Sequence, residues 1–225
     1  MKKIIGFLSI FFLTSLTVSA QENEVQKENK FFVAFTGGPS FPIGQFGDSK
    51  LTETNDEAGF AKTGYNLNLN FGYQATENFG LALSIMYARH QLDMDGIHQI
   101  DPTLKADHWQ YYGILVGPIV TAPISDKVKL DFKVLGGASN VNFPLISVEN
   151  LVSSKENWAT AFTWQIGTNL RYNFSPNACF ISNLDYTYTN PKTTYLIGSN
   201  GDSIKEEVQQ KMGIVNFTIG IGIRF

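Results

Sequence analysis

Three histidines are the residues best suited to metal chemistry in this chain. His90, His98 and His108 are its only histidines, and imidazole with carboxylate is a donor set for zinc and other divalent cations. Four aspartates lie among them: Asp93, Asp95, Asp101 and Asp107. The alternative interpretation is a hydrated polar loop that holds these histidines without a metal. We favour the polar loop and expect neither a metal nor a cofactor, with the three histidines as the candidates to examine.

Nucleophilic catalysis is the second chemistry to weigh, because it needs a serine or cysteine beside a base and an orienting group. Ser84 and His90 share one segment, but in an extended chain their spacing separates them by about 20 Å. The single cysteine, Cys179, excludes a disulfide-stapled scaffold and is expected to be a packed small residue. No motif identifies a nucleophile, so the sequence predicts no catalytic residues and a protein that is not an enzyme.

The segments that carry these residues alternate between apolar and polar side chains, which is typical of β-strands. The clearest example is Phe79, Leu81, Leu83 and Ile85, which alternate with small residues. The faces of the segment 108–120 are ambiguous. Eight strands are predicted, at 31–38, 65–73, 79–87, 108–120, 128–134, 162–172, 178–189 and 215–225.

Composition excludes several protein classes. Charged residues make up 16% of the 225 residues, against about 25% in soluble domains. Beyond the N-terminus, no run approaches the roughly 18 apolar residues of a membrane-spanning helix, which excludes a helical membrane bundle. The net charge of −3 lacks the excess of basic residues that is typical of nucleic-acid-binding proteins. A single β-rich domain with dispersed apolar residues remains.

The connections between the strands alternate in length. Short turns are expected near 74–78, 121–126 and 174–177, and long polar loops at 39–62, 91–107, 139–157 and 190–209. Transmembrane barrels of the outer membrane have short periplasmic turns and long external loops.

A soluble barrel or sandwich would show the same alternation, so other features have to distinguish the two. The apolar faces end in aromatic residues, as membrane-interface girdles do, and the opposite faces carry small or amide side chains that fit a narrow interior. We therefore predict an all-β, eight-stranded antiparallel up-and-down transmembrane β-barrel with short periplasmic turns and four long external loops.

The N-terminus predicts export. Lys2 and Lys3 precede the apolar stretch from Ile4 to Val18, and Val18-Ser19-Ala20 has the pattern of a cleavage site. We expect residues 1–20 to be a cleaved signal peptide, 21–30 a flexible periplasmic leader, and 31–225 the barrel domain.

Six charged residues are predicted to point into the barrel. They are Lys129, Asp131, Lys133, Arg171, Asp185 and Arg224. Isolated charges in a narrow interior are costly, so they should pair or remain hydrated. Two interpretations follow: a polar passage or anion site, and a plug of ion pairs. We favour the plug, because eight strands leave little internal space.

Several segments resemble the small outer-membrane β-barrel proteins of Bacteroidetes-type bacteria, which are similar in architecture to the OmpA and OmpX type. The segments are Gly37-Gly38-Pro39-Ser40-Phe41-Pro42-Ile43-Gly44 with Phe46, Thr63-Gly64-Tyr65-Asn66-Leu67 with Glu77-Asn78-Phe79-Gly80, Gly117-Pro118 with Pro123-Ile124-Ser125-Asp126-Lys127, and the final Arg224-Phe225. The resemblance implies a location in the outer membrane. It also implies that the barrel assembly machinery recognises the last strand through Ile221, Ile223 and Phe225.

These observations predict an integral outer-membrane protein whose external loops carry a structural or surface-binding role. The alternative is a narrow pore, which the inward-facing charges would line, or an accessory component of an outer-membrane secretion system, because a related group assists protein secretion across that membrane. A lipid-A-modifying or proteolytic outer-membrane enzyme is the weaker alternative. The expected partners are outer-membrane lipid and the barrel assembly machinery, without nucleic acid, and the sequence does not name an external ligand.

Overall fold

The structure is a computed structural model that describes residues 29–50, 58–100, 102–144, 146–147, 157–199 and 202–225. The predicted signal peptide, 1–20, lies outside the described residues. So does the predicted leader, except for its last two residues.

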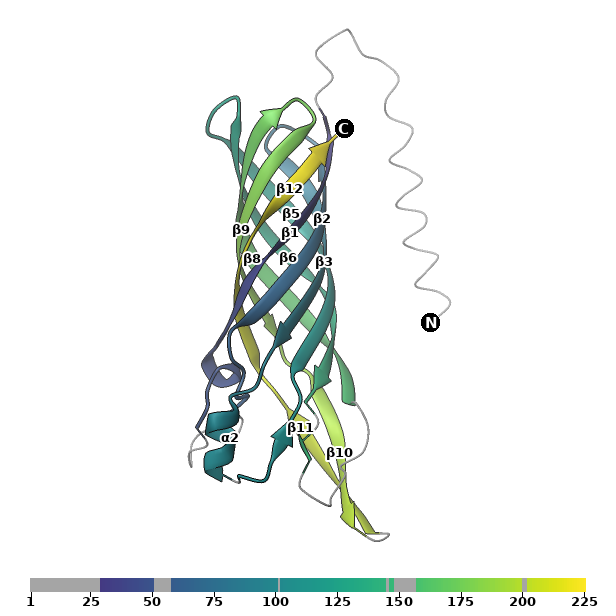
Figure 1. Cartoon of the computed structure of the whole chain (residues 1–225). Helices are drawn as coiled ribbons and strands as arrows, with labels where there is room; N and C mark the ends of the chain where they lie inside the picture. Colours follow the sequence, from purple (N-terminus) through teal and green to yellow (C-terminus); the bar gives the residue numbers. More distant parts are fainter. Residues whose placement is uncertain (1–28, 51–57, 101, 145, 148–156, 200–201) are drawn as a thin grey trace, which may run out of the picture.

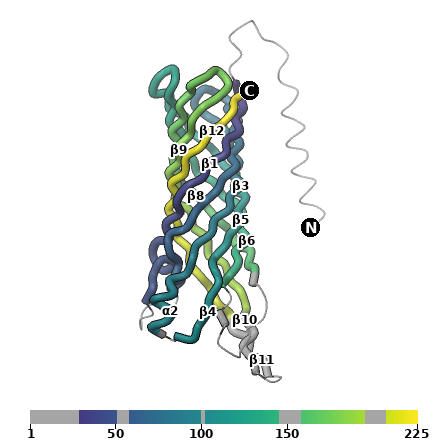
Figure 2. The backbone as a smooth tube through the Cα atoms, viewed as in Figure 1, coloured from purple at the N-terminus to yellow at the C-terminus, as the bar shows by residue number. Residues whose placement is uncertain are grey.

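Eight strands form one closed antiparallel barrel (Figure 1). Their order around the barrel is β1-β12-β9-β8-β6-β5-β3-β2, so each strand pairs with its neighbour along the chain and β12 closes on β1. In Figure 2 the purple start and the yellow end of the barrel run side by side. The strands are β1 (Phe31–Ile43), β2 (Gly64–Gln74), β3 (Phe79–His90), β5 (Trp109–Pro123), β6 (Val128–Phe143), β8 (Asn157–Ser175), β9 (Ala178–Thr189) and β12 (Met212–Arg224). The predicted eight-stranded up-and-down barrel is confirmed.

Several strands are longer than predicted. β6 and β8 have 16 and 19 residues, whereas about 9–11 residues cross a membrane. The prediction ended the β6 strand early because Gly136 and Gly137 interrupt the alternation of large side chains. Both glycines nevertheless pair with β5 and β8. The barrel therefore continues into what were predicted to be the first parts of external loops.

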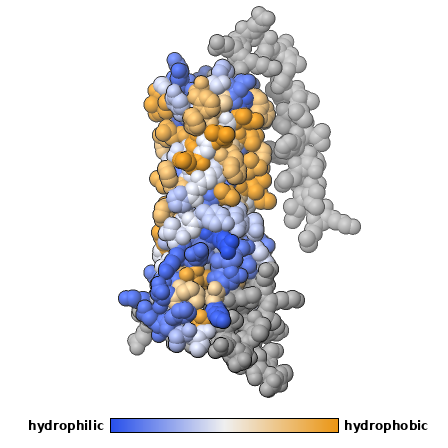
Figure 3. Space-filling model, viewed as in Figure 1, coloured by the Kyte–Doolittle hydropathy of each residue, from blue (hydrophilic) through white to orange (hydrophobic). Residues whose placement is uncertain are grey.

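Two belts of aromatic side chains surround the barrel. On the loop side, Tyr65, Tyr87, Tyr112 and Trp158 form a row with ring centroids 4.9–5.9 Å apart. On the short-turn side, Phe31 contacts Tyr73 and Phe225, and Phe174 contacts Phe180. Exposed aliphatic side chains such as Ile85, Ile166 and Leu184 lie on the same outward faces of the strands. Figure 3 shows apolar residues gathered around the part of the barrel nearer the C-terminus. Such belts are typical of the two membrane interfaces.

The barrel interior mixes polar and apolar side chains. β5, whose faces the sequence left ambiguous, points Tyr111, Leu115 and Ile119 inward, and all three are buried. Its outward residues include Tyr112 and Ile114, with exposed fractions of 49% and 59%. Both faces of β5 are therefore apolar, which explains why alternation did not distinguish them.

The long connections contain secondary structure that the sequence did not predict. The first holds the 3-10 helix η2 (Gly44–Phe46), and the second holds α2 (Met94–Ile100). β4 (Lys105–Ala106) pairs with β7 (Ile146–Ser147), so the second connection is joined to the third. In the fourth, β10 (Lys192–Ser199) pairs with β11 (Asp202–Gln209) as a hairpin. Among the described residues, no helix is both long enough and apolar enough to cross a membrane.

Candidate functional site

Two ion pairs lie inside the barrel. The Lys133 ammonium nitrogen is 2.9 Å and 3.1 Å from the two carboxylate oxygens of Asp185, and a guanidinium nitrogen of Arg171 is 2.6 Å from Asp131 Oδ1. Each of the four side chains is at least 96% buried. Four of the six charges that were predicted to point inward thus occupy the interior as two pairs.

The first pair crosses over a glycine. Gly167 on β8 lies opposite both Lys133 on β6 and Asp185 on β9. A Cβ atom at this position would lie 2.0 Å from Asp185 Oδ1. The missing side chain lets a lysine and an aspartate on non-adjacent strands meet across the strand between them.

The second pair is part of a wider network. Thr121 Oγ1 donates to Asp131 Oδ1 at 2.7 Å and accepts from Gln74 Nε2 at 2.7 Å. The Arg171 guanidinium also lies 4.8 Å from the centroid of the Phe32 ring. These contacts place polar and aromatic groups across the interior near the short turns.

Ser40 and His90 form a buried pair that the sequence analysis missed. Ser40 Oγ is 3.2 Å from His90 Nε2 and donates to Asn216 Oδ1 at 2.6 Å, while His90 Nδ1 lies 3.1 Å from the Lys62 carbonyl oxygen. Serine beside histidine is the start of a nucleophilic site. Both side chains are fully buried, however, and the Phe46 ring lies against His90 with centroids 5.3 Å apart. The arrangement therefore fills the interior and presents no nucleophile to a substrate.

The structure does not bring the three histidines together. His98 Nε2 contacts the Leu104 carbonyl oxygen at 3.1 Å on the outside. His108 contacts Asp107, Arg89 and Gln110, whereas His90 is inside the barrel. In the described part of the chain, no group of three or more His, Cys, Asp or Glu side chains is placed to hold a metal.

An apolar cluster packs at the external end of the barrel. Its side chains come from the first two external connections and from the ends of β5 and β6. We call this cluster the external cap: Phe46, Phe60, Leu92, Ile97, Trp109 and Phe143, all with exposed fractions of at most 9%. The Trp109 ring lies 5.5 Å from that of Phe46 and 4.9 Å from that of Phe143, and its indole nitrogen donates to the Gly59 carbonyl at 2.9 Å. The third long connection, 139–157, lies mostly outside the described residues.

Charged and backbone contacts join the first two external connections. Lys62 Nζ is 2.9 Å from Asp93 Oδ1 and 3.6 Å from Asp95 Oδ2, and Ala61 forms a β-bridge with Leu92. The hydrogen bond from Lys62, followed by one from Ser49, lowers the pKa of Asp93 below its ordinary value of 3.8. The same contact with Asp93 raises the pKa of Lys62. With the β4–β7 pairing, three of the four external connections are linked to one another.

The contact between Lys62 and Asp93 should weaken in acid. Because the pKa of Asp93 is lower in the folded state than in the unfolded state, its stabilising contribution is complete above pH 3.8 and is lost as the pH falls through the lowered pKa. We expect the carboxyl carbon shift of Asp93, followed by NMR, to titrate below pH 3.8, and Lys62→Met to move the midpoint upward. Lys127→Met, at the opposite end of the barrel, is the control. An unchanged midpoint in Lys62→Met would show that Lys62 does not hold this carboxylate.

Solved structures share this architecture, although no protein-family model and no curated protein matches the chain. Neisserial surface protein A (NspA) matches with a TM-score of 0.53 and 13% identity over 87% of this chain and 97% of its own. A major outer membrane protein from Thermus thermophilus matches with a TM-score of 0.54 and 15% identity, covering 87% and 98%. The outer membrane protein OprG from Pseudomonas aeruginosa matches with a TM-score of 0.53 and 14% identity, covering 91% and 99%. The chain has the fold of a small outer-membrane β-barrel. At these identities the likeness concerns the fold.

The external end of this outer-membrane barrel carries most of its acidic residues. The segments 39–62, 91–107, 139–157 and 190–209 contain 13 of the 20 acidic residues and six basic ones, a net charge of −7. The fourth external connection also extends away from the barrel as the β10–β11 hairpin (Figure 1). The four external connections therefore hold most of the negative charge of the chain.

The remaining predicted site residues lie near the short turns. Lys129 and Arg224 are partly exposed there and take no part in the two interior ion pairs. Ile221, Ile223 and Phe225, the predicted assembly signal, have exposed fractions of 59–61%. They lie on the outer face of β12, whose two edges are paired with β1 and β9 in the closed barrel.

Proposed function

We propose that this chain is an integral outer-membrane protein that binds a basic partner at its external end. The observation that carries the proposal is the contrast between the packed interior of the barrel and its charged external connections. The interior holds two buried ion pairs among other packed side chains, and the external cap packs at the loop end. Three of the four external connections are linked to one another, and the four together carry a net charge of −7. Loops held on a rigid scaffold are the usual place for binding, and a negative surface attracts cationic partners.

The proposed location includes export by residues 1–20 and assembly through Ile221, Ile223 and Phe225. We also propose that the chain is related to the Bacteroidetes-type barrels that its sequence resembles. We expect the protein in the outer-membrane fraction, with the gel mobility of the unheated sample differing from that of the heated one, and with Gln21 as its first residue. A full-length protein in the soluble periplasmic fraction would contradict this location.

A charge-matched comparison tests the binding role. The protein is placed in lipid nanodiscs, and a fluorescent decalysine peptide is the basic probe, followed by anisotropy. The double variant Asp95→Asn/Glu207→Gln removes two exposed external carboxylates, and we expect it to weaken binding about fivefold. The control Glu77→Gln/Asp126→Asn removes the same charge near the short turns and should leave binding unchanged.

Two outcomes would contradict the binding role. The first is the absence of saturable decalysine binding, and the second is an equal loss in the two double variants. Planar-bilayer recording addresses the alternative of a narrow pore. The filled interior supports an expectation of no sustained conductance, and a stable open channel in the intact protein would favour the pore.

A further inference from the structure

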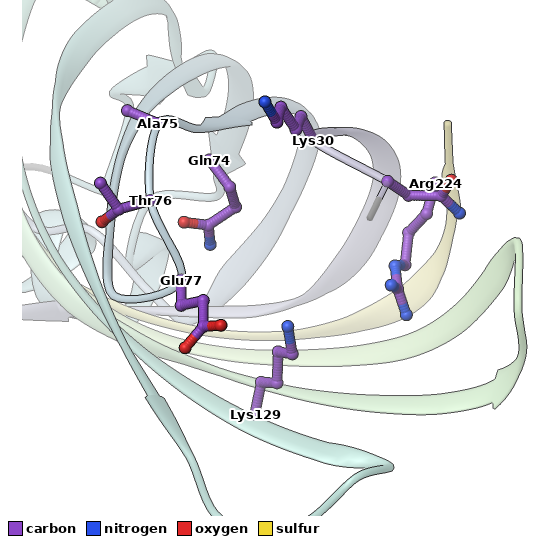
Figure 4. Close-up of a pocket in the computed structure, with 8 residues that line it drawn as sticks. Lys30, Gln74, Ala75, Thr76, Glu77, Lys129 and Arg224 are labelled. Carbon is purple, nitrogen blue, oxygen red and sulfur yellow. The ribbon is translucent and has the colours of Figure 1, made fainter. Parts of the chain in front are cut away.

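A cavity of about 240 Å³ opens at the short-turn end of the barrel (Figure 4). It lies at the opposite end from the acidic external surface. We call it the periplasmic cavity, and it is lined by Asn29, Lys30, Gln74, Ala75, Thr76, Glu77, Lys129 and Arg224. Its volume is roughly that of eight water molecules at about 30 Å³ each, which is enough for a small polyatomic ion with part of its hydration shell.

The charges around this cavity are predominantly positive. Lys30 precedes β1, Lys129 lies on β6 and Arg224 ends β12, so the barrel brings together three cations that are far apart in the sequence. Glu77 supplies the one carboxylate among the lining side chains. In the view of Figure 4, the Lys129 ammonium lies between Glu77 and the Arg224 guanidinium.

These cations differ from those inside the barrel. Within the described residues, no ion pair within 4 Å involves the side chains of Lys30, Lys129, Arg224 or Glu77. Lys133 and Arg171, by contrast, each have a carboxylate partner. Like charges around one cavity repel one another, and a bound anion relieves that repulsion. Among the described residues, the side chains that line the cavity therefore carry three positive charges against one negative charge.

The backbone that carries the cavity is held in place. The Asn29 side-chain amide donates to the Pro176 carbonyl oxygen at 3.0 Å and to Asn177 Oδ1 at 3.2 Å, and the Gln74 backbone amide donates to the Lys30 carbonyl at 2.7 Å. Gln74 Nε2 is directed to Thr121 in the polar network below. Gln74 Oε1 is buried and has no hydrogen-bond partner among the described residues, so it can accept from a hydroxyl group or from water.

We propose that the periplasmic cavity binds a small anion that carries a phosphate group. Three cations supply the charge, and the planar guanidinium of Arg224 matches phosphate oxygens in two-point contact. This site is separate from the proposed external function. The phosphate has two sources at this end of the barrel: a phospholipid headgroup of the inner leaflet, and a soluble periplasmic anion.

Pyrophosphate is the probe for the test. The full-length protein is folded in a neutral detergent without phosphate, and pyrophosphate is titrated while the side-chain amide signal of Gln74 is followed by NMR. We expect saturable binding that Lys129→Gln and Lys30→Gln each weaken about fivefold. The matched control is Lys127→Gln, two residues from Lys129 in the exposed turn and outside the cavity lining. Heat-modifiable gel mobility verifies that each variant is folded.

A second titration, with the short-chain phospholipid dihexanoyl phosphatidylglycerol, distinguishes the sources. Competition with pyrophosphate for the same Gln74 signal supports the site and identifies the headgroup as a source. A response to pyrophosphate alone supports the site with a soluble anion as its ligand. The proposal is overturned if neither compound gives saturable shifts, or if Lys127→Gln weakens binding as much as Lys129→Gln.

Discussion

Replacing Asp185 by leucine should lower the free energy of unfolding by about 3–5 kcal/mol, because it leaves the Lys133 ammonium buried without a counter-charge. Lys133 is 97% buried, and Asp185 is the carboxylate within ion-pair distance of it. Neighbouring groups offer little compensation, since Gly167, which lies between the two strands, has no side chain. The measurement is urea unfolding in micelles, followed by tryptophan fluorescence.

The double variant Lys133→Met/Asp185→Leu distinguishes a lost ion pair from a damaged core. Apolar side chains of similar volume remove both charges, so we expect most of the stability to return. Asp126→Leu, at an exposed turn, should change stability by less than about 0.5 kcal/mol. If the single and double variants were equally destabilised, packing would explain the loss and the buried charge would not.

Phe46→Ala should cost about 3–5 kcal/mol, the range for removing a buried phenylalanine side chain. The Phe46 ring is fully buried against His90 and Trp109 at the centre of the external cap. The cavity that its removal leaves has His90 and Trp109 on its sides, so we also expect a red shift of tryptophan fluorescence. Urea unfolding measures the first effect and emission spectra the second.

Phe46→Leu is the matched control, because it keeps most of the apolar volume and should cost less than about 1.5 kcal/mol. Equal stability of Phe46→Ala and the native protein would mean that the external cap contributes no packing energy. In that case the first external connection would have to be held mainly by Lys62 and by its backbone bonds.

The sequence predicted which strand residues face outward or inward better than it predicted the contacts inside the barrel. Alternation placed Leu81 and Ile85 outward and Asp131 and Asp185 inward, because side chains in a strand change face at every residue. The same rule failed on β5, where Tyr111 and Ile114 are both apolar although they point to opposite faces. It also ended β6 too early, at its two glycines. The alternation of apolar and polar residues therefore predicted orientation reliably in strands whose inward and outward faces differ in polarity.

Most contacts of the candidate sites were not predictable. Ser40 and His90 are 50 positions apart, and Lys133 and Asp185 are 52 apart. Whether such residues meet depends on the pairing register of the strands between them, and the parity of one strand contains no information about that register. The external cap is a similar case, since nothing in the predicted polar loop 39–62 shows which of Phe41, Phe46 and Phe60 is buried.

By itself, the sequence determined the number of strands, the face that lies toward lipid and the end of the barrel that carries the long acidic connections. These properties follow from local periodicity and from the length and composition of each connection. Only the tertiary structure decided which interior charges pair, that Phe46 is buried at the external end, and that Lys30, Lys129 and Arg224 line one cavity. Closure of the barrel is the physical reason, because it fixes the register of all eight strands together. Residues far apart in the sequence are thereby brought to the same level along the barrel axis.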